Sequence, residues 1–264
     1  MAEPEHDFEV VWEIEPPLRA DVDLLHAQLA SATDVATSIL VPDNHTGRAT
    51  VSSIAIARVV AMRGRRATAC LNARDRNLLG LRRDLLTCAF DGVDDLLLVY
   101  GDEPDIGARA SDLTVRTMVE ECRLQAPNLR VGVTTRLRAV PAWKRAADRL
   151  FVQVSYDMDA LLRWRDGITF AGPVYPAVMV IPSTSMARRL AARVPALRVP
   201  EGWLDAIDQD PAAGVELAAL LAERIRASGA FEGVHIVSGR RHREAATRLR
   251  GLATSPHPCT AVPV

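Results

Sequence analysis

The chain has 264 residues, of which 48% are hydrophobic and 25% charged, and its 32 basic and 33 acidic residues leave a formal net charge of -1. This length and balance predict one large soluble domain with a full core, and they give no electrostatic case for binding nucleic acid or an anionic membrane. The sequence has neither a secretory signal pattern nor an apolar run long enough to span a membrane, so we expect a cytoplasmic protein.

Eight short apolar runs recur along the chain. Most of them are apolar enough to be covered on both faces, as the strands of a parallel sheet are. The predicted strands are 9–14, 37–41, 67–72, 95–100, 130–134, 150–154, 174–180 and 233–237.

Helical periodicity fills the intervals between these strands. The predicted helices are 21–31, 51–62, 77–90, 111–125, 142–147, 158–166, 183–193 and 212–227, with a final one at about 241–249. Eight strands alternating with helices predict a single (β/α)8 TIM barrel for residues 1–264, with its core at about 9–250 and loose ends at 1–7 and 255–264. An open doubly wound sheet is the alternative, but the turn after the first strand carries Pro16-Pro17 and no GxGxxG motif.

In a barrel the carboxyl ends of the strands meet at one mouth, so polar residues at those ends become neighbours. This rule selects Glu13 and Glu15, Asp43 and Asn44, Asn72 and Asp75, Asp102, and Gln153 with Tyr156 and Asp157. We therefore expect the chemistry of the protein to lie among these side chains.

Glu13 stands between Trp12 and Ile14, just before two prolines. An apolar environment pushes a carboxyl group toward its neutral form, which a general acid working near neutral pH requires. Pairing with an arginine, or capping a turn, is the other interpretation of Glu13.

Two further candidates also have two interpretations each. Asp75 is placed to meet free backbone amides at the start of the third helix, which would make it a structural residue. Gln153 lies in a predicted buried strand, where its amide must find partners. Such an amide suits the edge of a pterin or another heterocycle, and a satisfied core glutamine is the alternative.

Cysteine and histidine spacing predicts no metal site. The six histidines form no HExxH pair, and the cysteines form no CxxC pair. We expect ordinary thiols in a reducing compartment at Cys70, Cys88, Cys122 and Cys259.

Several segments, in order from about residue 9 to 250, resemble the methylenetetrahydrofolate reductases. In the first half they are Glu13-Ile14-Glu15-Pro16-Pro17, Val41-Pro42-Asp43-Asn44, Arg74-Asp75-Arg76-Asn77, Gly101-Asp102-Glu103-Pro104 and Ala110-Ser111-Asp112-Leu113. In the second half they include Phe151-Val152-Gln153, Ile181-Pro182 and Gly233-Val234-His235-Ile236. No single segment is specific, but the colinear set is.

The resemblance implies a (β/α)8 barrel that passes a hydride from NADH or NADPH, through FAD, to 5,10-methylenetetrahydrofolate and gives 5-methyltetrahydrofolate. By position, Glu13 matches the general acid that protonates the folate N10. Asp102 matches the carboxylate near the flavin and the pterin, and Gln153 matches a pterin-binding amide. Asn72 and Asp75 fall in the loop that lines the flavin.

At several of the remaining positions this sequence departs from the residues that the family usually has. Tyr156 and Met186 fall on the substrate side, and Met186 stands where a stacking aromatic or leucine is expected. Arg109 and Ala110 fall on the cofactor side, with Arg109 in place of a tyrosine. The segment 136–147 is shorter than in relatives. In it Arg136 and Lys144 are the candidates for holding the flavin diphosphate, and solvated surface residues are the other explanation.

The expected ligands are therefore a reduced folate as substrate, NADH or NADPH as hydride donor and FAD as cofactor. Three alternatives stay open: direct hydride transfer without a flavin, a non-catalytic folate-binding barrel, and a reductase for another pterin or one that uses a deazaflavin. We expect neither a nucleic-acid nor a membrane partner, and a homo-oligomer is compatible with the sequence.

Overall fold

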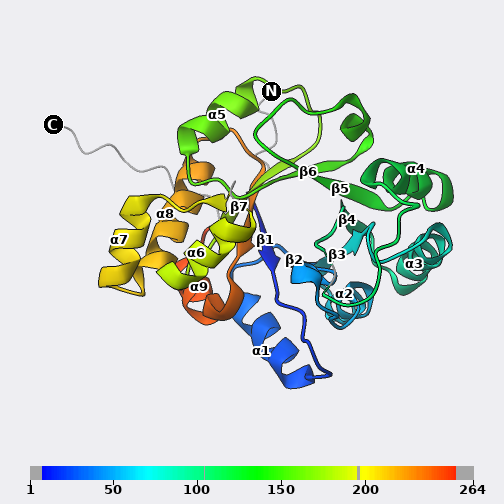
Figure 1. Cartoon of the computed structure of the whole chain (residues 1–264), viewed down its shortest axis with the longest axis horizontal. Coiled ribbons are helices and arrows are strands. Elements are labelled where there is room, and N and C mark those ends of the chain that lie inside the picture. Colours follow the sequence, from blue (N-terminus) through cyan, green and yellow to red (C-terminus); the bar gives the residue numbers. More distant parts are fainter. Residues whose placement is uncertain (1–7, 104, 195–196, 254–264) are drawn as a thin grey trace.

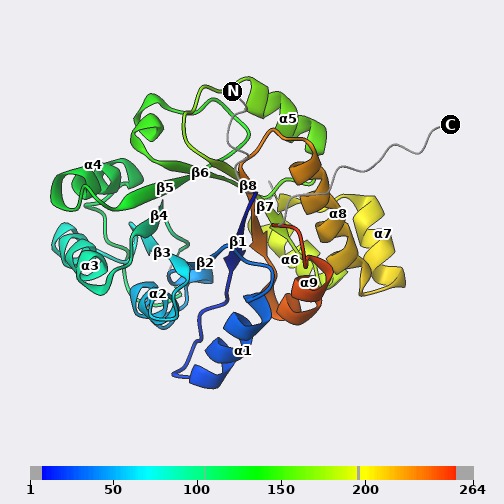
Figure 2. The same ribbon diagram turned by 180° about the vertical axis from the view of Figure 1, so that it is seen from behind.

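A computed structural model describes residues 8–103, 105–194 and 197–253. Eight parallel strands close into a barrel in the order β1 to β8, and helices surround it (Figure 1 and Figure 2). The predicted (β/α)8 barrel is thereby confirmed. The strands are β1 (Glu9–Glu13), β2 (Ser38–Val41), β3 (Arg66–Asn72), β4 (Asp95–Val99), β5 (Arg130–Thr135), β6 (Arg149–Val152), β7 (Val174–Met179) and β8 (Gly233–Val237).

Helices lie between most of the strands, and most of them agree with the predicted ranges. They are α1 (Val22–Ala32), α2 (Ser53–Ala61), α3 (Leu78–Asp91), α4 (Val115–Gln125), α5 (Met158–Asp166), α6 (Thr184–Arg193), α7 (Glu201–Gln209), α8 (Ala213–Ala227) and α9 (His242–Arg248). Short 3-10 segments occur at η1 (His45–Gly47), η2 (Ala142–Ala146) and η4 (Gly239–Arg241).

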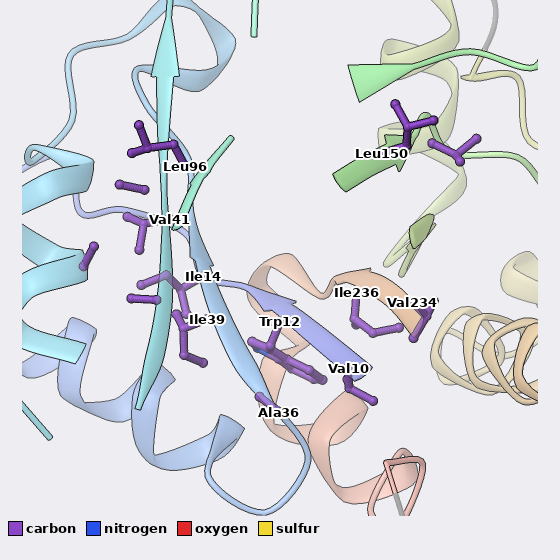
Figure 3. Packing of buried hydrophobic residues seen from close by; sticks show 14 of the residues in the cluster. Val10, Trp12, Ile14, Ala36, Ile39, Val41, Leu96, Leu150, Val234 and Ile236 are labelled. Atoms are coloured by element: carbon purple, nitrogen blue, oxygen red, sulfur yellow. The ribbon is translucent and has the colours of Figure 1, made fainter. Parts of the chain in front are cut away.

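Strand alternation divides the core into two layers, since successive side chains of a strand point to opposite faces. Val10, Trp12 and Ile14 leave β1 on its outer face and pack with Ile39 and Ile236 in the layer between strands and helices (Figure 3). The barrel interior holds a second cluster of Val11, Leu40, Cys70, Leu97, Phe151 and Tyr175. The odd-numbered positions of β1 therefore face the interior, where a mouth site can form.

Three predicted elements differ from the structure in type or extent, and one helix was not predicted. The regular helix predicted at 142–147 is wrong. The structure has the 3-10 segment η2 there, which begins directly after Pro141. The helix predicted from residue 111 begins at Val115, where the Thr114 side chain caps it. The sixth strand ends at Val152 instead of residue 154, and no helix was predicted at α7, which lies on the periphery beside α8 (Figure 1).

The amino-terminal end of the barrel contains a network of charged side chains. Asp95 on β4 is 2% exposed and forms ion pairs with Arg149, at 3.1 Å, and with Arg130, at 2.8 Å. Glu9 on β1 accepts hydrogen bonds from the Tyr175 hydroxyl, at 2.7 Å, and from Arg66, at 2.8 Å. This network closes the end opposite the mouth, so we assign it a structural role.

Among the described residues no helix is long and apolar enough to cross a membrane. Cys70, Cys88 and Cys122 are free and buried, and burial raises the pKa of the Cys88 and Cys122 thiols to about 12. The predicted loose ends and Cys259 lie outside the described residues.

Candidate active site at the barrel mouth

A cavity of about 630 Å³ opens at the carboxyl ends of the strands. Polar groups line one part of it, and apolar side chains from the strand ends and from α6 line the rest. The polar lining is Glu13, Thr46, Asp102, Glu103, Asp105, Thr134, Gln153 and His235. The apolar lining is Leu97, Phe151, Val152, Val154, Ala177, Met179, Leu190, Val194, Leu197 and Val237. The strand-end rule thus placed Glu13, Asp102 and Gln153 in one cavity.

Glu13, the last residue of β1, contacts a second polar side chain inside this cavity. Its Oε2 lies 2.9 Å from Nε2 of His235 on the neighbouring strand β8. The Glu13 side chain is 21% exposed and that of His235 is 9% exposed. A carboxyl and an imidazole in this contact share a hydrogen bond whose donor is set by the histidine tautomer.

The apolar surroundings of Glu13 come from other strands and not from its sequence neighbours. Trp12 and Ile14 point outward into the layer below the helices, because side chains alternate along β1. Leu97 and Phe151 line the cavity with Glu13. The apolar side chains beside Glu13 therefore come from β4 and β6, and not from Trp12 and Ile14, on which the prediction relied.

His235 is the functional candidate that reasoning from the sequence missed. It is buried, and its ring meets the Phe151 ring edge-on with the centroids 5.7 Å apart. It stands between Val234 and Ile236, so it resembles an ordinary core position of an apolar strand. Its inward register, two residues from the end of β8, was the available signal.

Gln153 does not occupy a buried strand, contrary to the prediction. Because β6 ends at Val152, Gln153 is exposed at the cavity rim, and its backbone N–H donates to the Thr135 carbonyl at 2.8 Å. None of the side-chain hydrogen bonds found among the described residues involves its amide. The Gln153 amide is therefore free to bind a polar ligand edge.

Asp102 lies on the loop after β4 and is exposed at the other side of the mouth. Its Oδ2 accepts a hydrogen bond from the backbone N–H of Thr46 at 2.7 Å. Thr46 and Asn44 adopt left-handed backbone angles, with φ of 62° and 46°. Asp102 therefore anchors the β2–α2 loop as well as lining the cavity.

Asn72 and Asp75 belong to a network beside the cavity and do not line it. The Asn72 side chain donates to Asp43 at 2.8 Å and to Asp75 at 2.7 Å. Asp75 also accepts from Asn44 at 2.9 Å. The α3 helix is instead capped by Asn77, so the interpretation of Asp75 as the cap was wrong. Both residues support the loops that surround the mouth.

The predicted cofactor residues are not brought together at the cavity. Arg109 is exposed and donates to the Tyr100 hydroxyl at 3.4 Å, and Ala110 donates its N–H to the Arg74 carbonyl at 2.7 Å. Arg136 is exposed after β5. Lys144 donates to the Thr134 carbonyl at 2.5 Å, and burial together with the nearby Arg138 lowers its pKa.

Tyr156 and Met186 lie behind the cavity wall, outside its lining. The Tyr156 ring packs edge-on against Trp203 at 4.9 Å, and burial raises the pKa of its phenol. Met186 on α6 packs on the cluster formed by Ile181, Ala187, Val199 and Ile207. Through these contacts, Tyr156 and Met186 help to hold α6 and α7 against the barrel.

The cavity does not fit the diphosphate of FAD, which calls for cationic groups. Its charged lining among the described residues consists of Glu13, Asp102, Glu103, Asp105 and His235, with neither lysine nor arginine. Three arginines on the loops after β2 and β3 are paired with carboxylates, in the pairs Arg48–Asp105, Arg74–Glu103 and Arg76–Asp43, and Arg136 after β5 is exposed and does not line the cavity. The described lining therefore offers no lysine or arginine to hold a flavin diphosphate. In the described part of the chain, no group of three or more His, Cys, Asp or Glu side chains is arranged to hold a metal ion.

Comparison with known proteins supports the fold. No family model and no curated protein matches this chain. An uncharacterized protein from Clostridium thermocellum that binds two copies of 5-methyl-5,6,7,8-tetrahydrofolic acid matches with a TM-score of 0.68 and 11% identity, over 94% of this chain and 95% of its own. EDTA monooxygenase from Chelativorans sp. BNC1 matches with a TM-score of 0.56 and 11% identity, over 94% and 93%. At these identities the likeness establishes the class, a (β/α)8 barrel, and the resemblance to a particular reductase family stays a prediction.

Proposed function

We propose that the protein binds a reduced folate at the barrel mouth and reduces 5,10-methylenetetrahydrofolate to 5-methyltetrahydrofolate with NADH or NADPH. The observation that carries the proposal is the Glu13–His235 contact inside a largely apolar cavity at the carboxyl ends of the strands. Support for the substrate class comes from the clostridial barrel of the same fold, which binds 5-methyltetrahydrofolic acid.

Glu13 supplies the acid in this reaction. Its neutral carboxyl gives a proton to the folate N10, which opens the five-membered ring to an iminium ion. The hydride of NADH or NADPH then adds to the iminium carbon, so one proton and one hydride convert the methylene group to a methyl group. We propose that the hydride passes directly from the nicotinamide. The diphosphate of NADH or NADPH, like that of FAD, meets no lysine or arginine among the described residues that line the cavity, so in this proposal it binds outside the cavity.

The other lining residues bind and shield the substrate. Gln153 can both donate to and accept from the edge of a pterin ring. Phe151 and Leu97 form an apolar floor, and Leu197 adds to the wall. These side chains exclude water from the iminium carbon, which would otherwise be hydrolysed.

The test combines a binding measurement, a turnover measurement and two variants. Wild-type protein should bind 5-methyltetrahydrofolate in calorimetry and oxidise NADH or NADPH only when methylenetetrahydrofolate is present, without visible flavin absorbance. Glu13→Gln should lower turnover by about 100-fold or more while retaining folate binding. Ala177→Phe, which fills the cavity, should abolish binding while retaining the circular dichroism of the fold.

The outcomes separate the alternatives. Failure of wild-type protein to bind 5-methyltetrahydrofolate overturns the proposal. Binding without NAD(P)H oxidation indicates a non-catalytic folate-binding barrel. Flavin absorbance that disappears when FAD is removed, together with loss of turnover, indicates the flavin-dependent reaction. Full turnover by Glu13→Gln shows that the acid is misassigned.

A further inference from the structure

His235 is held in the barrel wall by strand pairing on both sides. It lies within β8, with Val11 of β1 as its register partner on one side and Ala177 of β7 on the other. The rings of Phe151 and His235 are nearly perpendicular, with their centroids 5.7 Å apart. A side chain fixed by two strands and an aromatic contact can hold a partner group in one orientation.

Only one oxygen of Glu13 is engaged by the protein. Oε2 contacts His235, and none of the hydrogen bonds found among the described residues uses Oε1. Glu13 lines the cavity, so Oε1 is the oxygen available to a ligand. The two carboxyl oxygens are thus in different environments.

We propose, on the basis of the proposed function, that His235 is the positioning residue of the acid. Its Nε2–H donates to Oε2 of Glu13. That bond makes Oε2 the carbonyl oxygen of the neutral acid and leaves the proton on Oε1, where it faces the folate N10. After the proton has moved to N10, the same N–H stabilises the carboxylate that remains.

The negative charges around Glu13 and His235 explain why the Glu13 carboxylate needs a hydrogen-bond donor. The other ionisable groups of the described lining are the rim carboxylates Asp102, Glu103 and Asp105. Cys70 on β3 lies nearby, and burial, with the negative charges of Asp43 and Glu13, raises the pKa of its thiol well above the usual range. Among the hydrogen bonds found for the described residues, the contact with His235 is the one made by the Glu13 side chain. His235 is therefore the group placed to donate to the carboxylate left on Glu13.

Two substitutions separate positioning from packing. His235→Gln places an amide N–H where Nε2 stands, whereas His235→Leu fills the space without a donor. We expect His235→Leu to lower kcat by about 10- to 100-fold and His235→Gln to stay within about 5-fold of wild type. Both should bind 5-methyltetrahydrofolate with nearly unchanged affinity. His26→Gln, the same change on the exposed face of α1, should leave every parameter unchanged.

A second measurement does not depend on turnover. Long-range ¹H–¹⁵N spectra of the imidazoles report which ring nitrogen carries the proton, and the His235→Gln spectrum assigns the His235 signals. We expect a protonated Nε2 in wild-type protein and a mixture of tautomers in Glu13→Leu. An unprotonated Nε2 in wild-type protein, full kcat in His235→Leu, or equal losses in both His235 variants would each overturn the proposal. If wild-type protein has no folate activity, the proposed function fails, while the spectra still decide whether His235 donates to Glu13.

Discussion

The Asp102 carboxylate holds the backbone of Thr46, with 2.7 Å between Oδ2 and the amide nitrogen. Thr46 has a φ of 62°, which a β-branched residue rarely adopts. The next residue, Gly47, accepts a hydrogen bond from the Asp105 N–H at 2.8 Å. The loops after β2 and β4 are therefore bound to each other across one side of the mouth, and the strain at Thr46 is maintained by these contacts.

Gly47→Ala should disrupt this junction. A methyl group at Gly47 would lie 2.0 Å from the Glu103 carbonyl oxygen, and the φ of 77° is itself unfavourable for alanine. We expect a loss of about 2–5 kcal/mol of unfolding free energy and weaker folate binding, measured by chemical denaturation and calorimetry.

Gly64→Ala is the matched control for this substitution. Gly64 has a φ of 72°, but nothing lies within 4 Å of the added methyl group. It should cost only about 1 kcal/mol and leave folate binding intact. Equal losses in the two variants would mean that backbone conformation, and not the contact with Glu103, sets the requirement for glycine.

Asp102→Ala should affect binding more than chemistry. The substitution leaves the Thr46 N–H without its partner, so the β2–α2 loop loses an anchor worth about 1 kcal/mol. We expect KM for the folate to rise with a smaller change in kcat, and steady-state kinetics with stability measurements will check this. A fall in kcat at unchanged KM would instead place Asp102 in the chemical step.

The sequence predicted the eight strands well because each is a compact apolar run with a turn or helix on either side. Where a boundary depended on longer-range contacts, it was missed. Val154 continues the apolar run of β6, yet the strand ends at Val152 because β7 pairs no further than that residue. The helix α7 was missed because its burial is set by α8 and α6, which the local pattern does not contain.

The site was predicted in part for a similar reason. Polar residues that directly follow strands are visible in a sequence, and Glu13 and Asp102 were found in this way. His235 lies inside an apolar strand, and only the pairing of β8 with β1 brings it to Glu13. The hydrogen-bond partners of Asp75 and Lys144 are also set by the folded structure. Asp75 accepts from the Asn72 side chain, and Lys144 donates to the Thr134 carbonyl. Matching residues to a family by position could not reveal these bonds.

The buried pair at the opposite end of the barrel should dominate stability. Asp95→Ala leaves Arg149, which is 5% exposed, without its carboxylate, and we expect a loss of about 3–5 kcal/mol. Glu120→Ala removes the exposed pair between Arg116 and Glu120 on α4 and should cost about 0.5 kcal/mol or less. Denaturant unfolding at neutral pH measures both, and similar costs would contradict a structural role for the Asp95 network.

Glu9 should make stability depend on pH in a predictable direction. Burial favours its neutral form, but the hydrogen bonds from Tyr175 and Arg66 and the charge of Arg66 outweigh burial and lower its pKa. A carboxyl with a lowered pKa in the folded state stabilises the fold above the unfolded value of about 4.3, and this contribution is lost as the pH falls through the folded pKa.

The stability advantage of wild-type protein over Glu9→Gln should therefore be largest near neutral pH and shrink below about pH 4. Denaturant unfolding of both proteins across this range gives the difference directly. Tyr175→Phe removes one of the two hydrogen bonds and retains the ion pair with Arg66, so its pH dependence should be intermediate. A difference that stays constant, or grows, on acidification would show that Glu9 is not held in its charged form by these partners.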